Sequence, residues 1–211
     1  MNLLEKLTTK WENSSDPFLI HPTGQLSFAE ISAQDPVDLS AIKTGDVVAL
    51  VGDFNPPSIL TLLRLIDLGV IIVPLTVETA EDHEYFFESA RVDIVIKDSL
   101  IKRRETGQAH PMIEDLRKRG NAGLVLFSTG TTGRPKAILH DFSYFLKRFE
   151  TPRPTLRTIN FLLFDHIGGM NTLLHTLFNR GVVVAPEDRS VEGILASCKE
   201  HGVEVLPTTP T

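Results

Sequence analysis

The chain has 211 residues, of which 42% are apolar and 23% are charged, so a disordered tail and a fibrous repeat are both excluded. Twenty-one lysines and arginines stand against 27 aspartates and glutamates, which gives a formal net charge of -6. Because nucleic-acid binders concentrate positive charge to contact phosphates, this balance argues against nucleic acid as a partner.

The N-terminal segment, residues 1–11, carries Glu5, Lys6 and Lys10 among its leucines and lacks the apolar run of a secretory signal peptide. The longest strongly apolar stretch, residues 68–75, is far shorter than the roughly 20 residues that span a bilayer. We therefore expect a cytoplasmic protein with no membrane span.

In the first half of the chain, short β-branched runs alternate with helical patterns. Residues 47–51 predict a buried strand, and Pro56 and Pro57 open a helix that is apolar on most of its surface. A second apolar strand follows at residues 70–73 and is expected to end at Pro74. Residues 78–90 then predict a more polar helix, and residues 93–96 a third strand. All three strands are candidates for parallel pairing.

The second half continues this alternation after a polar segment, residues 97–121, that contains a short predicted helix at 112–119. The expected strands are residues 123–127, 159–163, 182–185 and 203–206. Three helices are expected in this half, one containing Phe142, one containing Met170 and one containing Val191. Gly181 is expected to cap the helix that contains Met170. The pattern predicts an α/β fold with a largely parallel sheet flanked by helices, in one compact unit.

One cysteine, Cys198, excludes a disulfide framework within a single chain. It falls on the apolar stripe of the last predicted helix, with Val191, Ile194 and Leu195. A small buried side chain is therefore expected there rather than a nucleophile.

The strand at residues 123–127 leads into Ser128-Thr129-Gly130-Thr131-Thr132-Gly133-Arg134-Pro135-Lys136. The two glycines allow main-chain N–H groups to approach an anion closely. The hydroxyls add further donors, and the lysine adds a mobile positive charge. This composition is typical of a polyphosphate-binding loop. It differs from the Walker loop, in which the lysine follows glycine and precedes serine or threonine.

This string resembles the signature loop of the adenylate-forming superfamily, which includes acyl- and aryl-CoA synthetases, luciferases and the adenylation domains of peptide synthetases. Thr129 and Ala137 stand where serine and glycine are usual. Residues 44–75 resemble an early core segment of that family, and residues 164–170 resemble its second substrate-site motif. Residues 204–211 resemble the strand that follows, so the resemblance extends from about residue 46 onwards.

The resemblance implies specific roles in a reaction of MgATP with a small-molecule carboxylate. The β- and γ-phosphates would be held by Ser128, Thr129, Gly130, Thr131, Thr132, Gly133 and Lys136. His166 would lie between the carboxylate and the α-phosphate, which makes Lys136 and His166 the expected catalytic residues. The expected substrate-binding residues are Asp165, His166, Gly168 and Gly169. No metal ligand is expected in this chain, and the main ligand of Mg²⁺ is expected outside it.

In that family the carboxylate attacks the α-phosphorus, releases pyrophosphate and leaves an acyl-adenylate. A thiol of CoA or of a carrier protein then accepts the acyl group. The segment from His166 to Gly169 favours the CoA-ligase form. Phe164 and Asp165 also resemble a pair that binds the substrate ammonium in peptide-synthetase adenylation domains, so amino-acid adenylation remains the alternative. For His166 itself, a purely structural role is the competing interpretation.

Superfamily members continue with an aromatic-Gly-x-Thr-Glu motif, an aspartate that binds the ribose, and a mobile C-terminal domain with a catalytic lysine. None of these occurs in residues 1–211. We therefore expect the chain to be an incomplete N-terminal ATP-binding large domain that is inactive alone. A sheet interrupted in this way would expose an edge, which predicts self-association as a homodimer. A non-catalytic module that binds an anion or nucleotide is the second alternative.

Overall fold

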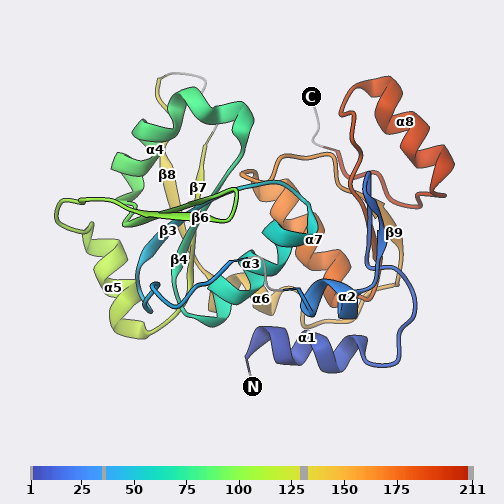
Figure 1. The fold of residues 1–211 in the computed structure, drawn as a ribbon, viewed down its shortest axis with the longest axis horizontal. Helices are drawn as coiled ribbons and strands as arrows, with labels where there is room; N and C mark the ends of the chain where they lie inside the picture. The colour runs from blue at the N-terminus through green and yellow to red at the C-terminus, as the bar shows by residue number, and fades with distance from the viewer. Residues whose placement is uncertain (1, 35–36, 129–132, 209–211) are drawn as a thin grey trace.

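The computed structural model describes residues 2–34, 37–128 and 133–208, which form two β-sheets with helices between and outside them (Figure 1). The larger sheet has the strand order β6-β5-β3-β4-β7-β8. Its strands are β3 (Val47–Val51), β4 (Ile71–Leu75), β5 (Ile94–Lys97), β6 (Leu100–Arg103), β7 (Gly123–Phe127) and β8 (Ala137–Asp141). The four inner strands are parallel, and the two edge strands pair antiparallel with their neighbours.

The smaller sheet has the order β2-β1-β10-β9. Its strands are β1 (Leu19–His21), β2 (Gly24–Leu26), β9 (Arg157–Ile159) and β10 (Val182–Val184). Strands β1, β10 and β9 are parallel, and β2 is antiparallel to β1. The α/β fold expected from the sequence is confirmed, with two sheets where the sequence pattern predicted one.

The helices are α1 (Leu3–Trp11), α2 (Phe28–Ser32), α3 (Pro56–Asp67), the 3-10 helix η1 (Val77–Asp82), α4 (His83–Ala90), α5 (Pro111–Arg119), α6 (Phe142–Lys147), α7 (Ile167–Phe178) and α8 (Val191–Glu200). Apolar residues on one face of the larger sheet pack against α3 and α7, and those on the other face pack against α4 and α5. Every residue of strand β3 is buried because helices cover both faces of this sheet. In Figure 1, α3 and α7 lie between the two sheets, and α8 lies outside the smaller one.

Trp11, the last residue of α1, connects this helix to α7 between the two sheets. Its indole nitrogen donates a hydrogen bond to the Leu177 carbonyl of α7 at 3.0 Å. Its ring stacks with Phe28 and meets Phe18 edge to face. A residue close to the N-terminus therefore helps to fix the helix that links the two sheets.

Strand β4 continues through Pro74 to Leu75, although the sequence pattern predicted an end at the proline. The Ile71 N–H donates toward β3, to the Asp46 carbonyl. Successive residues of a strand direct their backbone N–H and C=O groups to opposite sides, so the nitrogen of Pro74 faces β7. Since β7 pairs with β4 only at Ile71 and Ile72, no ladder hydrogen bond is lost at the proline.

The helix predicted over residues 78–90 is two helices, η1 and α4. Thr79 has φ -97° and ψ 16°, outside helical geometry, so the chain is kinked within η1, which ends at Asp82 just before α4 begins. The Thr79 hydroxyl bonds to the Thr76 carbonyl and to Asp165, so side-chain contacts replace the regular helical pattern.

Neither edge strand of the larger sheet, β6 or β8, was predicted, and β1 and β2 of the smaller sheet were not predicted either. β6 lies in the polar segment after β5, and the turn between them holds Asp98 and Ser99 at φ 49° and 62°. Such a turn closes a two-residue hairpin and usually contains glycine, which is absent from this turn. Strand β9 ends at Ile159 rather than continuing to residue 163. The next residue, Asn160, bonds to the Gly169 carbonyl of α7, and the chain leaves the sheet.

Helix α7 ends at Phe178, and Arg180, two residues later, has the left-handed conformation at φ 56°. Gly181 follows and donates to the Thr176 carbonyl at 2.9 Å, so it completes the cap without being its left-handed residue.

In α8 no residue is fully buried, and Val191 and Leu195 are exposed. Cys198 is half-buried, because α8 packs on the smaller sheet along one narrow side only.

Among the residues that the structure describes, no helix combines the length and the apolar character needed to cross a bilayer.

We expect the substitution Trp11→Phe to lower the free energy of unfolding by about 1–3 kcal/mol. It removes the donor to Leu177 and leaves space beside Phe18 and Phe28. Urea unfolding followed by far-UV circular dichroism measures this change. An unchanged unfolding midpoint would show that α1 does not stabilise α7.

Candidate active site

A pocket of about 510 Å³ lies where β4 and β7 end and the turn before α7 begins. Leu75 and Phe127, the last residues of these two strands, both line it. Because the strands are parallel, their carboxyl ends lie at the same edge of the sheet. The full lining is Leu75, Thr79, Asp82, Phe86, Phe127, Ser128, Pro135, Phe161, Leu162, Leu163, Asp165 and His166.

The pocket brings together the two segments that the sequence analysis singled out, although about 30 residues of chain separate them. Ser128 and Pro135 come from the glycine-rich loop, and Asp165 and His166 come from the turn before α7. This proximity results from the tertiary fold, because the segments belong to neighbouring elements of the structure and not of the sequence.

Ser128 and Lys136 close the base of the glycine-rich loop, which connects β7 and β8. The Ser128 N–H donates to the Lys136 carbonyl at 3.0 Å, and the Lys136 N–H donates to the Ser128 hydroxyl at 3.1 Å. The Lys136 side chain is exposed, and Gly133 has a positive φ of 122° that favours glycine. The remaining predicted loop residues, Thr129, Gly130, Thr131 and Thr132, lie outside the described residues.

His166 caps the N-terminus of α7. Its Nδ1 accepts a hydrogen bond from the Gly168 N–H at 3.1 Å. An accepting Nδ1 requires the tautomer that carries its proton on Nε2. The ring is therefore held in one orientation and retains an Nε2–H donor. The side chain has a structural role as a helix cap and also lines the pocket.

Asp165 is half-buried and accepts hydrogen bonds from the hydroxyls of Thr76 and Thr79, each at 3.3 Å. Burial raises the pKa of the Asp165 carboxyl above its ordinary value. The threonine hydroxyls oppose this shift, and the nearby negative charge of Glu78 adds to it. Among the described residues, no cation contributes to the shift in the pKa of Asp165.

The two glycines of the turn have different surroundings. A Cβ at Gly169 would collide with the backbone carbonyl oxygen of Leu163 and approach the Phe54 ring at 2.9 Å. A Cβ at Gly168 would meet Leu162 Cδ1 at 2.7 Å, the end of a flexible side chain. Neither glycine lines the pocket. Their visible role is to let the turn and the first residues of α7 pack closely.

Sequence reasoning missed Thr76, Thr79 and Tyr85. Thr76 directly follows β4, and a polar residue at the carboxyl end of a buried parallel strand is a signal that could have found it. Thr79 lies inside a segment that reads as a regular helix. Tyr85 donates to the Pro135 carbonyl at 2.7 Å, and nothing in the sequence indicates this contact across 50 residues.

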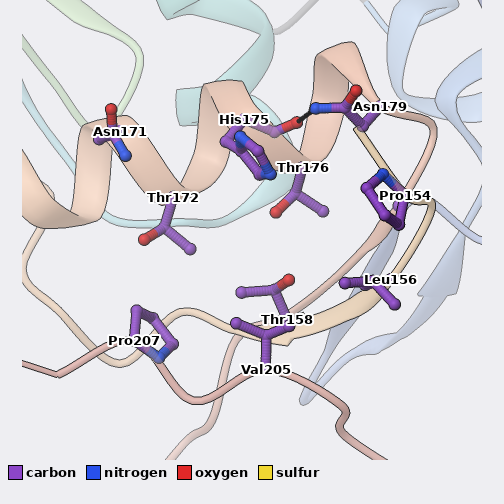
Figure 2. Close-up of a pocket in the computed structure, with 11 residues that line it drawn as sticks. Pro154, Leu156, Thr158, Asn171, Thr172, His175, Thr176, Asn179, Val205 and Pro207 are labelled. Carbon is purple, nitrogen blue, oxygen red and sulfur yellow. Dashed lines mark hydrogen bonds between the residues drawn. The ribbon is translucent and has the colours of Figure 1, made fainter. Parts of the chain in front are cut away.

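A second pocket of about 250 Å³ lies beside α7, on the side of the smaller sheet (Figure 2). Thr172 and Thr176 point from α7 toward Thr158 of β9. Thr176 is 2% exposed, and its hydroxyl oxygen has no hydrogen-bond partner in the described part of the chain. The wall of this pocket therefore includes an unpartnered hydroxyl whose oxygen is itself buried.

Residues 2–34, 37–128 and 133–208 contain no group of three or more histidines, cysteines or carboxylates placed to hold a metal ion. The first pocket instead combines hydroxyl and imidazole donors with an apolar lining that includes Phe86 and Phe127. Two carboxylates, Asp82 and Asp165, also line this pocket, so an anionic group would be favoured only beside the Ser128 hydroxyl and the His166 imidazole.

The sequence matches a family model described as AMP-binding enzyme over residues 39–211. No curated protein matches the sequence.

Several solved structures share the fold. The o-succinylbenzoate CoA synthetase MenE from Bacillus subtilis, in complex with the acyl-adenylate intermediate OSB-AMP, is 19% identical with a TM-score of 0.69. The N-terminal subdomain of NpsA from Klebsiella oxytoca, in complex with 3-hydroxyanthranilyl-AMSN, is 16% identical with a TM-score of 0.74. A luciferase-like enzyme from the nonluminescent mealworm Zophobas morio is 17% identical with a TM-score of 0.70.

Each of these comparisons covers 96% of this chain. The same comparisons cover 60% of MenE, 58% of NpsA and 57% of the mealworm enzyme. The chain therefore spans less than two thirds of the length of the solved structures it matches. At sequence identities of 16% to 19%, the structural similarity to these proteins establishes the fold.

We expect Gly169→Ala to lower the free energy of unfolding by about 1–3 kcal/mol, because the added methyl collides with backbone that has to move. Gly168→Ala is the matched control and should stay within about 1 kcal/mol of the wild type, since the Leu162 side chain can rotate away. Thermal unfolding of both variants measures the difference. Equal losses at the two positions would contradict this account of the turn.

We expect Asp165→Asn to stabilise the chain near neutral pH. The raised pKa of Asp165 means that the folded chain binds this proton more tightly than the unfolded chain does. The ionised carboxylate therefore costs stability above its folded pKa, and this cost disappears below the ordinary value of 3.8. The gain should vanish when urea unfolding is repeated below that pH, and a gain of equal size at both pH values would be inconsistent with this cause.

Proposed function

This chain belongs to the AMP-binding enzyme family of the adenylate-forming superfamily, and from that membership we propose that it is the ATP-binding part of a carboxylate-activating enzyme. In the proposed reaction a carboxylate oxygen of the substrate bonds to the α-phosphorus of ATP. The bond from that phosphorus to the bridging oxygen of the β-phosphate breaks, and pyrophosphate leaves. The observation that carries the proposal is the single pocket that joins the base of the glycine-rich loop to Asp165 and His166.

The residues present fit this chemistry. Lys136 and the Ser128 hydroxyl supply a positive charge and a polar group at the base of the loop, where the terminal phosphates would bind. The Nε2–H of His166 is a donor suited to an oxyanion or a phosphoryl oxygen. No general base is required, because a carboxylate is already ionised near neutral pH. The chain's contribution is to orient the reactants and stabilise charge.

Mg²⁺ bound to ATP would neutralise phosphate charge during this reaction. Its main protein ligand is proposed to lie outside these residues. The 211 residues are proposed to form the N-terminal part of the large domain and to show little or no adenylation alone. Their coverage of 57% to 60% of the solved structures supports this assignment.

The thiol of CoA is the proposed acceptor of the acyl group, in line with the Gly168 and Gly169 turn that follows His166. The acyl portion is proposed to extend along α7 toward the pocket in Figure 2. Thr172, which lines that pocket, lies six residues after His166, or about 9 Å along a helix axis. The threonine and asparagine lining favours an acyl group that carries hydrogen-bonding substituents.

Amino-acid adenylation with transfer to a carrier-protein thiol is the second candidate, and Asp165 favours it. Its carboxyl is half-buried, bonded to neutral hydroxyls and close to another negative charge. An ammonium group on the substrate would offset these unfavourable surroundings.

The proposal predicts that Lys136→Ala weakens binding of MgATP about tenfold or more, because it removes the positive charge proposed to contact the terminal phosphates. Isothermal titration calorimetry on the 211-residue chain measures this. Lys199→Ala, an exposed lysine in the last turn of α8, is a control with the same change of charge. Equal affinities in the two variants, or no binding by the wild type, would overturn the proposal.

The two candidate substrate classes are separated by titrating a matched pair of ligands in the presence of ATP. Phenylalanine and 3-phenylpropionate differ only in the amino group. Tighter binding of 3-phenylpropionate supports the CoA-ligase form. Tighter binding of phenylalanine, lost in Asp165→Asn, supports amino-acid adenylation.

A further inference from the structure

Helix α4 contacts both ends of the glycine-rich loop through two consecutive residues. The Phe86 ring stacks on Phe127, the last residue of β7, with 4.1 Å between ring centroids. The Tyr85 hydroxyl donates to the Pro135 carbonyl at 2.7 Å. Two neighbouring residues of α4 therefore contact Phe127, just before the loop, and Pro135, near its end.

Both polar groups of the peptide unit between Pro135 and Lys136, its C=O and its N–H, form hydrogen bonds. Its carbonyl oxygen accepts from Tyr85, and its N–H donates to the Ser128 hydroxyl at 3.1 Å. Both partners are side chains, and they come from different elements. Because this peptide plane leads directly to the Cα atom of Lys136, its orientation determines where the lysine side chain begins.

The Tyr85 ring makes a separate contact with the loop. The Arg134 guanidinium lies over it, 5.0 Å from the ring centroid. This cation–π contact depends on the aromatic face and not on the hydroxyl. Removal of the hydroxyl alone therefore tests the bond to Pro135 while the ring contact remains.

We propose that Tyr85 is a positioning residue for Lys136, and that its hydroxyl fixes the 135–136 peptide unit so that the lysine ammonium meets the terminal phosphates of ATP. This inference rests on the proposed function, which gives Lys136 its phosphate-binding role. Tyr85 does not line the pocket, so it acts through the loop and not by touching the ligand.

The test uses inorganic pyrophosphate with Mg²⁺ as the probe, because pyrophosphate carries the two phosphates that Lys136 would contact. Tyr85→Phe should weaken its binding about three- to tenfold, the effect of losing one neutral hydrogen bond. Tyr144→Phe is a matched control. Tyr144 is 65% exposed on α6, and its described contact is a ring contact with Lys147.

A double-mutant cycle shows whether Tyr85 acts through Lys136. In the Lys136→Ala background, Tyr85→Phe should have no further effect on pyrophosphate affinity. If Tyr85→Phe binds like the wild type, or weakens binding equally in both backgrounds, the positioning role is overturned while the phosphate site stands. If the wild type and Lys136→Ala bind pyrophosphate equally, the proposed function itself fails and the inference fails with it.

Limited trypsin digestion gives a second readout that does not depend on affinity. Release of the 135–136 peptide unit in Tyr85→Phe should speed cleavage after Lys136, as identified by the masses of the fragments. Arg134 is followed by proline, so it does not compete as a cleavage site. An unchanged cleavage rate after Lys136 would count against the positioning role.

Discussion

Parallel pairing between β4 and β7 brings the ends of these strands to the same edge of the larger sheet. Thr76 follows β4 and Ser128 follows β7, so two polar residues emerge at adjacent positions on that edge. The buried strand β3 holds β4 in place through five paired positions. Everything proposed for the site depends on this arrangement, because neither the loop nor its partners would be aligned without it.

Helix α7 carries the second half of the site and also joins the two sheets. Its buried residues belong to the same apolar core as α3 and the larger sheet, while β9 and β10 on either side of it in the chain belong to the smaller sheet. His166 therefore begins a helix that is fixed by packing over its whole length. At the same edge, Arg189 after β10 pairs with Asp53 after β3 at 2.6 Å, a second link between the sheets.

The electrostatics of the pocket are uneven. The base of the loop offers the exposed Lys136 and the Ser128 hydroxyl, whereas Asp82 and Asp165 line the pocket itself. The pKa of Asp165 is raised, and no cation among the described residues contributes to that shift. In a structural role, such a carboxylate is unfavourable near neutral pH. In a site it can discriminate between substrates, because a neutral or cationic group placed beside it is preferred over a second anion.

The sequence by itself determined the α/β class, the four inner strands of the larger sheet and the position of the glycine-rich loop, because these follow from local composition and periodicity. The strand predicted over residues 203–206 was wrong, since that segment forms only an isolated bridge between Val205 and Thr158. It also identified Ser128, Asp165 and His166 as candidates, and the structure places them around one pocket. It did not indicate Thr76, Thr79 or Tyr85, whose contacts with Asp165 and Pro135 cross 50 to 89 residues. The edge strands β6 and β8, the second sheet and the burial of Asp165 were likewise decided only by tertiary structure. Each depends on which distant elements pack together, and no local pattern in the chain records that choice.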